Sequence, residues 1–122
     1  MFLFSKSEKY FFNQKAIEEP TTNGNGSKNK RTVWSINTEP CPEAHFAVFP
    51  KALVRPCLLA GSRENDLVLD PFYGSGTVGL VAKELGRRCV GIEIKKEYTE
   101  IARKRTAFVQ RKLFNQLSQI PK

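Results

Sequence analysis

Apolar residues in the second half of the chain alternate between strand-like and helix-like spacing. Residues 67–69 form a short apolar run of strand-forming side chains, and a glycine-rich turn follows them directly. Residues 78–85 then have helical spacing, and Gly86 supplies a helix stop. A second apolar run at residues 88–92 predicts another strand. The order strand, turn, helix, strand predicts a parallel βαβ unit.

Two further helices are predicted on either side of this unit. Pro50 suits the first turn of a helix that ends at Gly61, and Pro56 within it removes a backbone donor. We therefore expect a kink or a restart at Pro56. A long final helix begins near Lys96, with its basic residues mostly outside its apolar stripe. The pattern predicts an α/β fold around the parallel βαβ core.

The first third of the chain has less regular spacing. Aromatic runs at residues 2–5 and 9–12 predict a β-hairpin over residues 1–17. Packing in a strand explains these aromatic side chains better than a base-stacking surface does. Residues 18–44 are rich in turn formers and predict a loop or linker region. Residues 45–122 would then be the cofactor-binding part of a single, incomplete domain.

Glycines and acidic residues around the first strand point to a cofactor. Gly74, Gly76 and Gly79 fit G-x-G-x-x-G, and Glu93 ends the second strand, where a carboxylate accepts hydrogen bonds from ribose hydroxyls. Asp70 stands before the glycines, where its charge would repel the pyrophosphate of a dinucleotide. A ligand with ammonium and sulfonium groups suits that place, which favours S-adenosylmethionine over NAD. Taken singly, Asp70 also fits a strand-ending turn and Glu93 a solvated strand end.

These residues also carry a family resemblance. Residues 70–77, Asp-Pro-Phe-Tyr-Gly-Ser-Gly-Thr, resemble the cofactor motif of the bacterial amino-group DNA methyltransferases of restriction–modification systems, which methylate the exocyclic nitrogen of adenine or cytosine. Residues 45–57 resemble the family's helix over the methionine end of the cofactor, and residues 91–93 its ribose-binding strand end. The order is similar to the permuted class, whose catalytic motif lies upstream. The resemblance implies a partial Rossmann-like methyltransferase fold with the hairpin at the sheet edge.

The resemblance also implies which residues hold S-adenosylmethionine. Asp70 and the turn after it hold the methionine moiety, the segment before the first predicted helix walls the methionine end, and Glu93 binds the ribose. Ile94 contacts the adenine face. The implied cofactor-binding residues are His45, Phe46, Phe49, Pro50, Asp70, Pro71, Phe72, Gly74, Ser75, Gly76, Thr77, Glu93 and Ile94.

A catalytic motif is missing from this sequence. In the family, Asp, Asn or Ser followed by Pro-Pro and an aromatic residue accepts hydrogen bonds from the target amino group and stacks on the flipped base. Asp70-Pro-Phe-Tyr73 departs from that motif, because Phe72 replaces the second proline and the glycine turn follows. We therefore predict the carboxyl-terminal part of a DNA methyltransferase that is inactive alone, with a catalytic half or a second protomer as a candidate partner.

The composition indicates which kinds of partner the chain could bind. A net charge of +8, from 20 basic and 12 acidic residues, suits DNA. It leaves open an alternative, a non-catalytic basic module that binds DNA or a partner chain and keeps a vestigial cofactor pocket. Three cysteines without C-x-x-C spacing and one histidine predict no metal site. No apolar run approaches the roughly 20 residues of a membrane helix, so we expect no membrane partner. Cysteines without a disulfide framework suggest a reducing cytoplasm.

Overall fold

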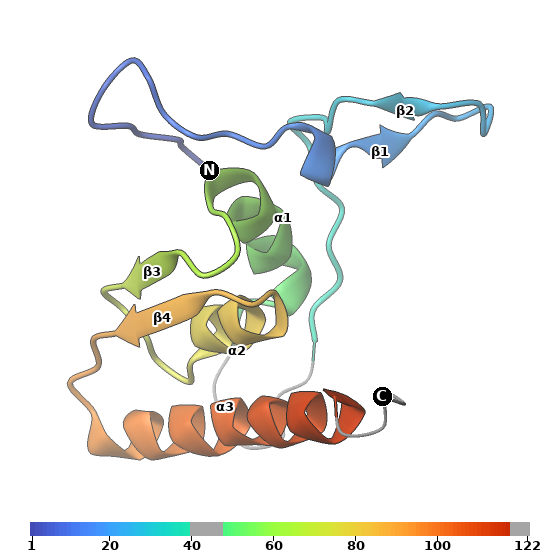
Figure 1. Ribbon diagram of the computed structural model, residues 1–122. Coiled ribbons are helices and arrows are strands. Elements are labelled where there is room, and N and C mark those ends of the chain that lie inside the picture. The colour runs from blue at the N-terminus through green and yellow to red at the C-terminus, as the bar shows by residue number, and fades with distance from the viewer. Residues whose placement is uncertain (40–47, 118–122) are drawn as a thin grey trace.

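A parallel pair of strands with its connecting helix forms the centre of the molecule. The computed structural model describes residues 1–39 and 48–117. Strand β3 (Leu67–Asp70) pairs in parallel with β4 (Arg88–Gly91), with Val68 opposite Cys89 and Asp70 opposite Gly91. Helix α2 (Thr77–Glu84) joins the two strands (Figure 1). The predicted parallel βαβ core is confirmed.

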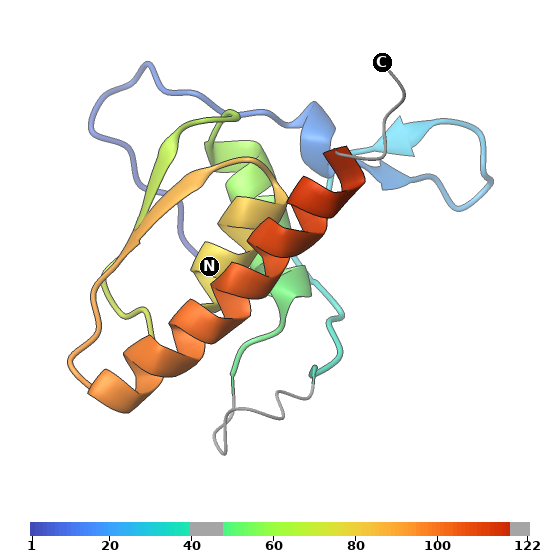
Figure 2. The same ribbon diagram turned by 60° about the horizontal axis from the view of Figure 1, so that its bottom comes forward.

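Helix α2 is also the centre of the helical layer. It contacts α1 (Lys51–Gly61), α3 (Lys96–Leu117) and both strands, and it lies between the two other helices (Figures 1 and 2). Val81 and Ala82 of α2 have no exposed surface, and Ala102 of α3 is only 1% exposed. Such complete burial on several sides explains why this short helix is predominantly apolar.

Charged side chains join α1 to the end of α2. Glu84 accepts a hydrogen bond from Lys51 at 3.1 Å and forms an ion pair with Arg55. Both basic residues are partly exposed, so the ion pairs add little to the apolar packing. Helix α1 continues through Pro56, so the predicted restart does not occur.

The hairpin is not where the sequence pattern placed it. Residues 1–13 form no strand, and Phe2 and Phe4 are each 87% exposed. A short hairpin of β1 (Glu19–Pro20) and β2 (Ser27–Lys28) lies instead within the predicted loop region, after a 3-10 turn at Lys15–Ile17. Two glycines with positive φ between β1 and β2 allow the tight reversal. The aromatic runs lack this turn chemistry and have no neighbouring strand in the described chain.

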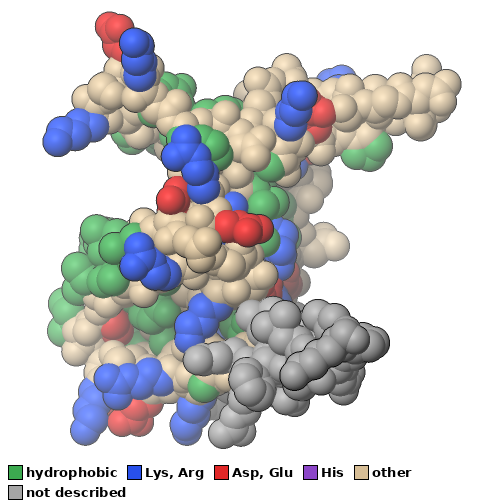
Figure 3. Space-filling view, in the orientation of Figure 1, with side chains coloured by type: hydrophobic (Ala, Val, Ile, Leu, Met, Phe, Trp, Pro, Cys, Tyr) green, Lys and Arg blue, Asp and Glu red, His purple; other side chains and the backbone are tan. Residues whose placement is uncertain are grey.

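One face of the β3–β4 pair is open. Paired residues of parallel strands point to the same side, so this face carries side chains from alternate positions of both strands. Its apolar members are between 47% and 61% exposed and form a hydrophobic patch over the strands (Figure 3). We call this patch the open sheet face; it consists of Leu67, Leu69, Val90 and Ile92. Among residues 1–39 and 48–117, no helix is long and apolar enough to cross a membrane.

The ring of Tyr73 occupies the space between the glycine turn, α2 and β4. A Cβ atom on Gly91 would lie 2.2 Å from Tyr73 Cγ, and one on Gly79 would lie 2.0 Å from Tyr73 Oη. Gly76, with φ of 80°, would bring a Cβ to 3.3 Å from the same ring and to 2.7 Å from Ala102 Cβ. These three glycines are therefore required for packing around Tyr73, which is the usual reason for the third glycine of the pattern.

We predict that Gly91→Ala destabilises the protein by about 1–3 kcal/mol, because the new methyl group overlaps the Tyr73 ring. Gly61→Ala is the control, since no atom lies within 4 Å of its Cβ and alanine favours a helix. Urea unfolding followed by circular dichroism measures both. Equal stabilities of the two variants would show that the ring can move aside.

Candidate functional site

Asp70 ends β3 with one carboxylate oxygen satisfied and the other unsatisfied. Its side chain is buried, and Oδ1 accepts a hydrogen bond of 3.0 Å from the backbone N–H of Phe72. Oδ2 is buried and has no hydrogen-bond partner among the described residues. A buried carboxylate oxygen without a partner is costly. It therefore marks a place where a donor from outside the chain would be favoured.

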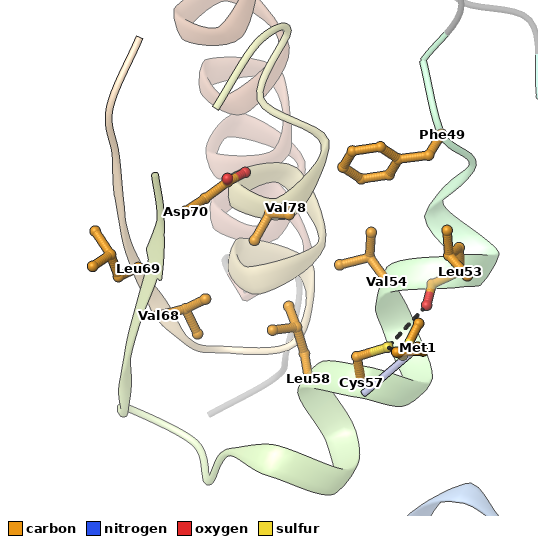
Figure 4. Close-up of a pocket in the computed structure, with 10 residues that line it drawn as sticks. All are labelled: Met1, Phe49, Leu53, Val54, Cys57, Leu58, Val68, Leu69, Asp70 and Val78. Carbon is orange, nitrogen blue, oxygen red and sulfur yellow. Dashed lines mark hydrogen bonds between the residues drawn. The ribbon is translucent and has the colours of Figure 1, made fainter. Parts of the chain in front are cut away.

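The carboxylate borders an apolar cavity. A cavity of about 320 Å³ opens between α1, β3 and the start of α2, with Asp70 and Val78 at one end (Figure 4). Phe49, Val54 and Leu58 form the wall on the side of α1. Of the side chains that line it among the described residues, only that of Asp70 is acidic. The cavity therefore suits a largely apolar group that carries positive charge near one end.

At the start of α2, hydrogen-bond donors rather than acceptors lack a partner. The N-cap residue Gly76 has no side-chain cap. The backbone N–H groups of Thr77, Val78 and Gly79 have no hydrogen-bond acceptor in the described part of the chain. Free N–H groups and the helix dipole favour an anionic group at this place. Since Val78 also lines the cavity, donors for an anion and an acceptor for a cation lie at neighbouring positions.

Glu93 connects the glycine turn to the end of β4. Its Oε2 accepts a hydrogen bond from Gly74 N at 2.8 Å, and its Oε1 accepts one from Lys95 N, also at 2.8 Å. These backbone N–H groups, that of Lys95 first, hold the pKa of Glu93 below its ordinary value of 4.5. Residues 74 and 93 are thereby brought together, as the sequence pattern required for a cofactor site.

Burial near Asp70 affects neighbouring titratable groups. Burial raises the pKa of Cys89 above its ordinary value, and the charge of Asp70 raises it further. Burial likewise raises the pKa of Tyr73, with Cys89 and Asp70 as smaller causes. Both shifts reflect weak solvation around the end of β3, where a charge interacts more strongly than in water.

The other site residues predicted from the sequence lie in different surroundings. Phe49 lines the cavity and Pro50 is the N-cap of α1. Phe72 and Ile94 are 87% and 98% exposed and point to no described partner. Ser75 and Thr77 are buried, with their hydroxyl oxygens near Arg105 of α3. Pro71 is exposed, Gly74 and Gly76 form the turn, and His45 and Phe46 lie outside the described residues.

Two residues of this region were not predicted from the sequence. The ring of Tyr73 spaces the turn from α2 and β4, and Arg105 donates hydrogen bonds to the turn. The sequence pattern places the basic residues of the final helix mostly outside its apolar stripe, but Arg105 departs from that pattern. Arg105 follows the buried Ala102 by three positions and precedes the buried Val109 by four, which places it on the inward stripe. That spacing was the signal available in the sequence.

Comparison with known proteins identifies relatives. A family model described as DNA methylase matches residues 1–104. The Type II methyltransferase M.SmaI of Serratia marcescens is 55% identical over 106 residues, which cover 86% of this chain and 36% of that protein. The Type II methyltransferase M.HinfI of Haemophilus influenzae is 39% identical over 109 residues, covering 82% of this chain and 29% of that protein. The chain thus spans about a third of the length of these relatives.

A solved structure has the same arrangement. The crystal structure of the M1.HpyAVI–SAM complex aligns with a TM-score of 0.59 and 35% sequence identity, over 80% of this chain and 44% of that chain. This likeness confirms the predicted partial Rossmann-like fold.

We predict that Glu93→Gln makes the thermal stability of the protein depend less on pH in the acidic range. The lowered pKa of Glu93 means that its stabilising contribution is present above the ordinary value of 4.5 and is lost as pH falls through the lower folded value. The parent should therefore lose more thermal stability than the variant between about pH 5 and pH 3. Glu100→Gln changes an exposed residue of α3 and should retain the parent profile. Parallel curves for Glu93→Gln and the parent would contradict the proposed linkage.

Proposed function

The chain belongs to the DNA methylase family, and from this premise we propose that it is the cofactor-binding part of a DNA methyltransferase that uses S-adenosylmethionine. The observation that carries the proposal is the buried Asp70 Oδ2, which has no partner in the described chain and borders an apolar cavity. The relatives and the aligned SAM complex support it. The methyl donor supplies an electrophilic sulfonium methyl group when it is bound.

The residues present fit the amino-acid end of this cofactor. Asp70 Oδ2 accepts a hydrogen bond from the α-ammonium group and neutralises its charge. The free N–H groups of Thr77, Val78 and Gly79 donate to the α-carboxylate. The side chains of Phe49, among others, shield the methylene chain from water. A dinucleotide fits less well, because its pyrophosphate would face the carboxylate of Asp70.

Glu93 is positioned to hold the ribose. Each carboxylate oxygen accepts one backbone N–H and keeps a second lone pair for a ribose hydroxyl. Ile94 and Phe72, both strongly exposed, supply apolar surface for the adenine. His45 and Phe46 complete the methionine-end wall in this proposal, as the family resemblance implies.

The reaction proposed is methyl transfer to the exocyclic amino group of adenine or cytosine in DNA. The sequence has no Pro-Pro-aromatic motif, and Asp70-Pro-Phe is used at the cofactor site. We infer that the remaining part of the methyltransferase, as a catalytic half or a second protomer, supplies the catalytic motif. The open sheet face and the coverage of about a third of each relative support this inference. Parallel sheets are normally covered on both faces.

A second candidate function rests on charge. The net charge of +8 and the exposed Lys96, Arg103 and Lys104 of α3 also suit a non-catalytic module that binds DNA. Such a module would bind DNA with strong salt dependence and without response to S-adenosylmethionine. Cofactor binding therefore separates the two functions.

We predict that the chain binds S-adenosylmethionine, and not NADH, and that Asp70→Asn weakens the binding at least about tenfold, as expected for loss of a charge-assisted hydrogen bond. Asparagine keeps the acceptor for Phe72 N, so the fold should persist. Asp66→Asn is the matched control, because Asp66 Oδ2 caps Arg63 N in an exposed turn. Calorimetric titration measures all three proteins. Equal affinities for the parent and Asp70→Asn would refute the role of this carboxylate.

We also predict that the chain alone transfers no methyl group to DNA, because its sequence lacks the motif that accepts the target amino group. The measurement is incorporation of radiolabelled methyl from S-adenosylmethionine into mixed-sequence DNA. A complete methyltransferase serves as the positive control. Turnover by this chain would show that other residues hold the target base.

A further inference from the structure

Arg105 is the only described residue of α3 whose charged group reaches the glycine turn. Its Nη1 donates to the carbonyl oxygen of Ser75 at 2.8 Å, to Ser75 Oγ at 2.7 Å and to Thr77 Oγ1 at 3.3 Å. Ser75 and Thr77 are 8% and 3% exposed. One guanidinium therefore contacts both Ser75, near the end of the turn, and Thr77, the first residue of α2.

The electrostatics of this contact are unfavourable for the chain by itself. The N-terminus of α2 already carries the positive end of the helix dipole, and a cation beside it is repelled. Arg105 contacts only neutral oxygens, and no carboxylate pairs with it in the described residues. Positive charge is thus concentrated on one side of the turn without a counter-charge.

The acidic residues of the site lie elsewhere around the turn. Glu93 holds Gly74, at its beginning, and Asp70 faces the cavity from the end of β3. The beginning of the turn is therefore bordered by negative charge and its end by positive charge. A ligand that carries an ammonium and a carboxylate on one carbon atom matches this separation of charge.

We propose that Arg105 is a positioning residue that holds the end of the turn and selects the carboxylate of the bound cofactor. The inference rests on the proposed cofactor function and adds a residue to it. By holding the Ser75 carbonyl and the Thr77 hydroxyl, Arg105 keeps the N–H groups of Thr77, Val78 and Gly79 free of local acceptors. Its positive charge beside Ser75 and Thr77 adds to the attraction of these donors for an anion. Arg105 acts through the turn and does not itself touch the ligand.

The test compares the parent with Arg105→Met, Arg105→Lys and the control Arg103→Met. Arg103 is an exposed residue of the same helix, so the control removes the same charge away from the turn. Each protein is titrated calorimetrically with S-adenosylmethionine and with its decarboxylated analogue. Amide hydrogen exchange without ligand is measured in residues 74–79 and, for comparison, in β3 and β4.

We predict that Arg105→Met weakens binding of S-adenosylmethionine about tenfold or more, by loss of a charge-assisted interaction, and leaves binding of the decarboxylated analogue unchanged. Arg105→Lys keeps the charge and should recover part of the preference for the carboxylate. Exchange should accelerate in Arg105→Met at Gly74 and Gly76, whose N–H groups are hydrogen-bonded at the turn, and remain unchanged in β3 and β4. Arg103→Met should behave as the parent.

Three results would overturn the inference. Equal weakening of both ligands, or faster exchange throughout the chain, would reduce Arg105 to a general stabilising residue. Parent-like exchange at Gly74 and Gly76 would show that the turn does not depend on Arg105. If the parent binds neither ligand, the proposed cofactor function fails, and the exchange measurement still decides whether Arg105 holds the turn.

Discussion

The position of Tyr73 determines how closely the turn, α2 and β4 approach one another. Its backbone N–H donates to Ile92 O at 2.9 Å, its carbonyl accepts from Gly76 N at 2.9 Å, and its ring lies against three glycines. Any side chain at Gly79 or Gly91 would overlap that ring. The ring and the glycines are therefore one packing unit, and the course of the chain from β3 into α2 depends on it.

The features of the candidate site follow from this packing. Because Tyr73 is anchored to the chain just beyond β4, the start of the turn lies beside Glu93, which accepts from Gly74 N. The end of the turn meets α3, where Arg105 donates to Ser75. Between these two contacts the first N–H groups of α2 stay unbonded, and Asp70 Oδ2 stays unpaired beside the cavity. The unsatisfied groups are thus concentrated at one place, while the neighbouring Gly74 and Ser75 are held by hydrogen bonds.

Local patterns predicted the features that depend on local chemistry. The apolar spacing gave the order of strands and helices, and the acidic residue after the second strand indicated the proximity of Glu93 to the turn. The hairpin was misplaced because aromatic runs signal a strand only where a partner strand exists, whereas positive-φ glycines directly permit the reversal at residues 24–26. The orientation of Ser75 and Thr77 toward α3 depends on Arg105, about 30 residues later, so short motifs do not reveal it.

The sheet and the cavity beside Asp70 differ in how much surrounding polypeptide each requires. Apart from Met1, the residues that line the cavity come from a continuous stretch of about 30 residues, from Phe49 to Val78, joined by short connections. The β3–β4 pair, in contrast, exposes Leu67, Leu69 and Val90 on the face away from α2. Apolar surface of this kind is stabilised only when another layer covers it. The pocket can therefore be built from local chain, whereas covering the sheet requires contacts with more distant or separate polypeptide.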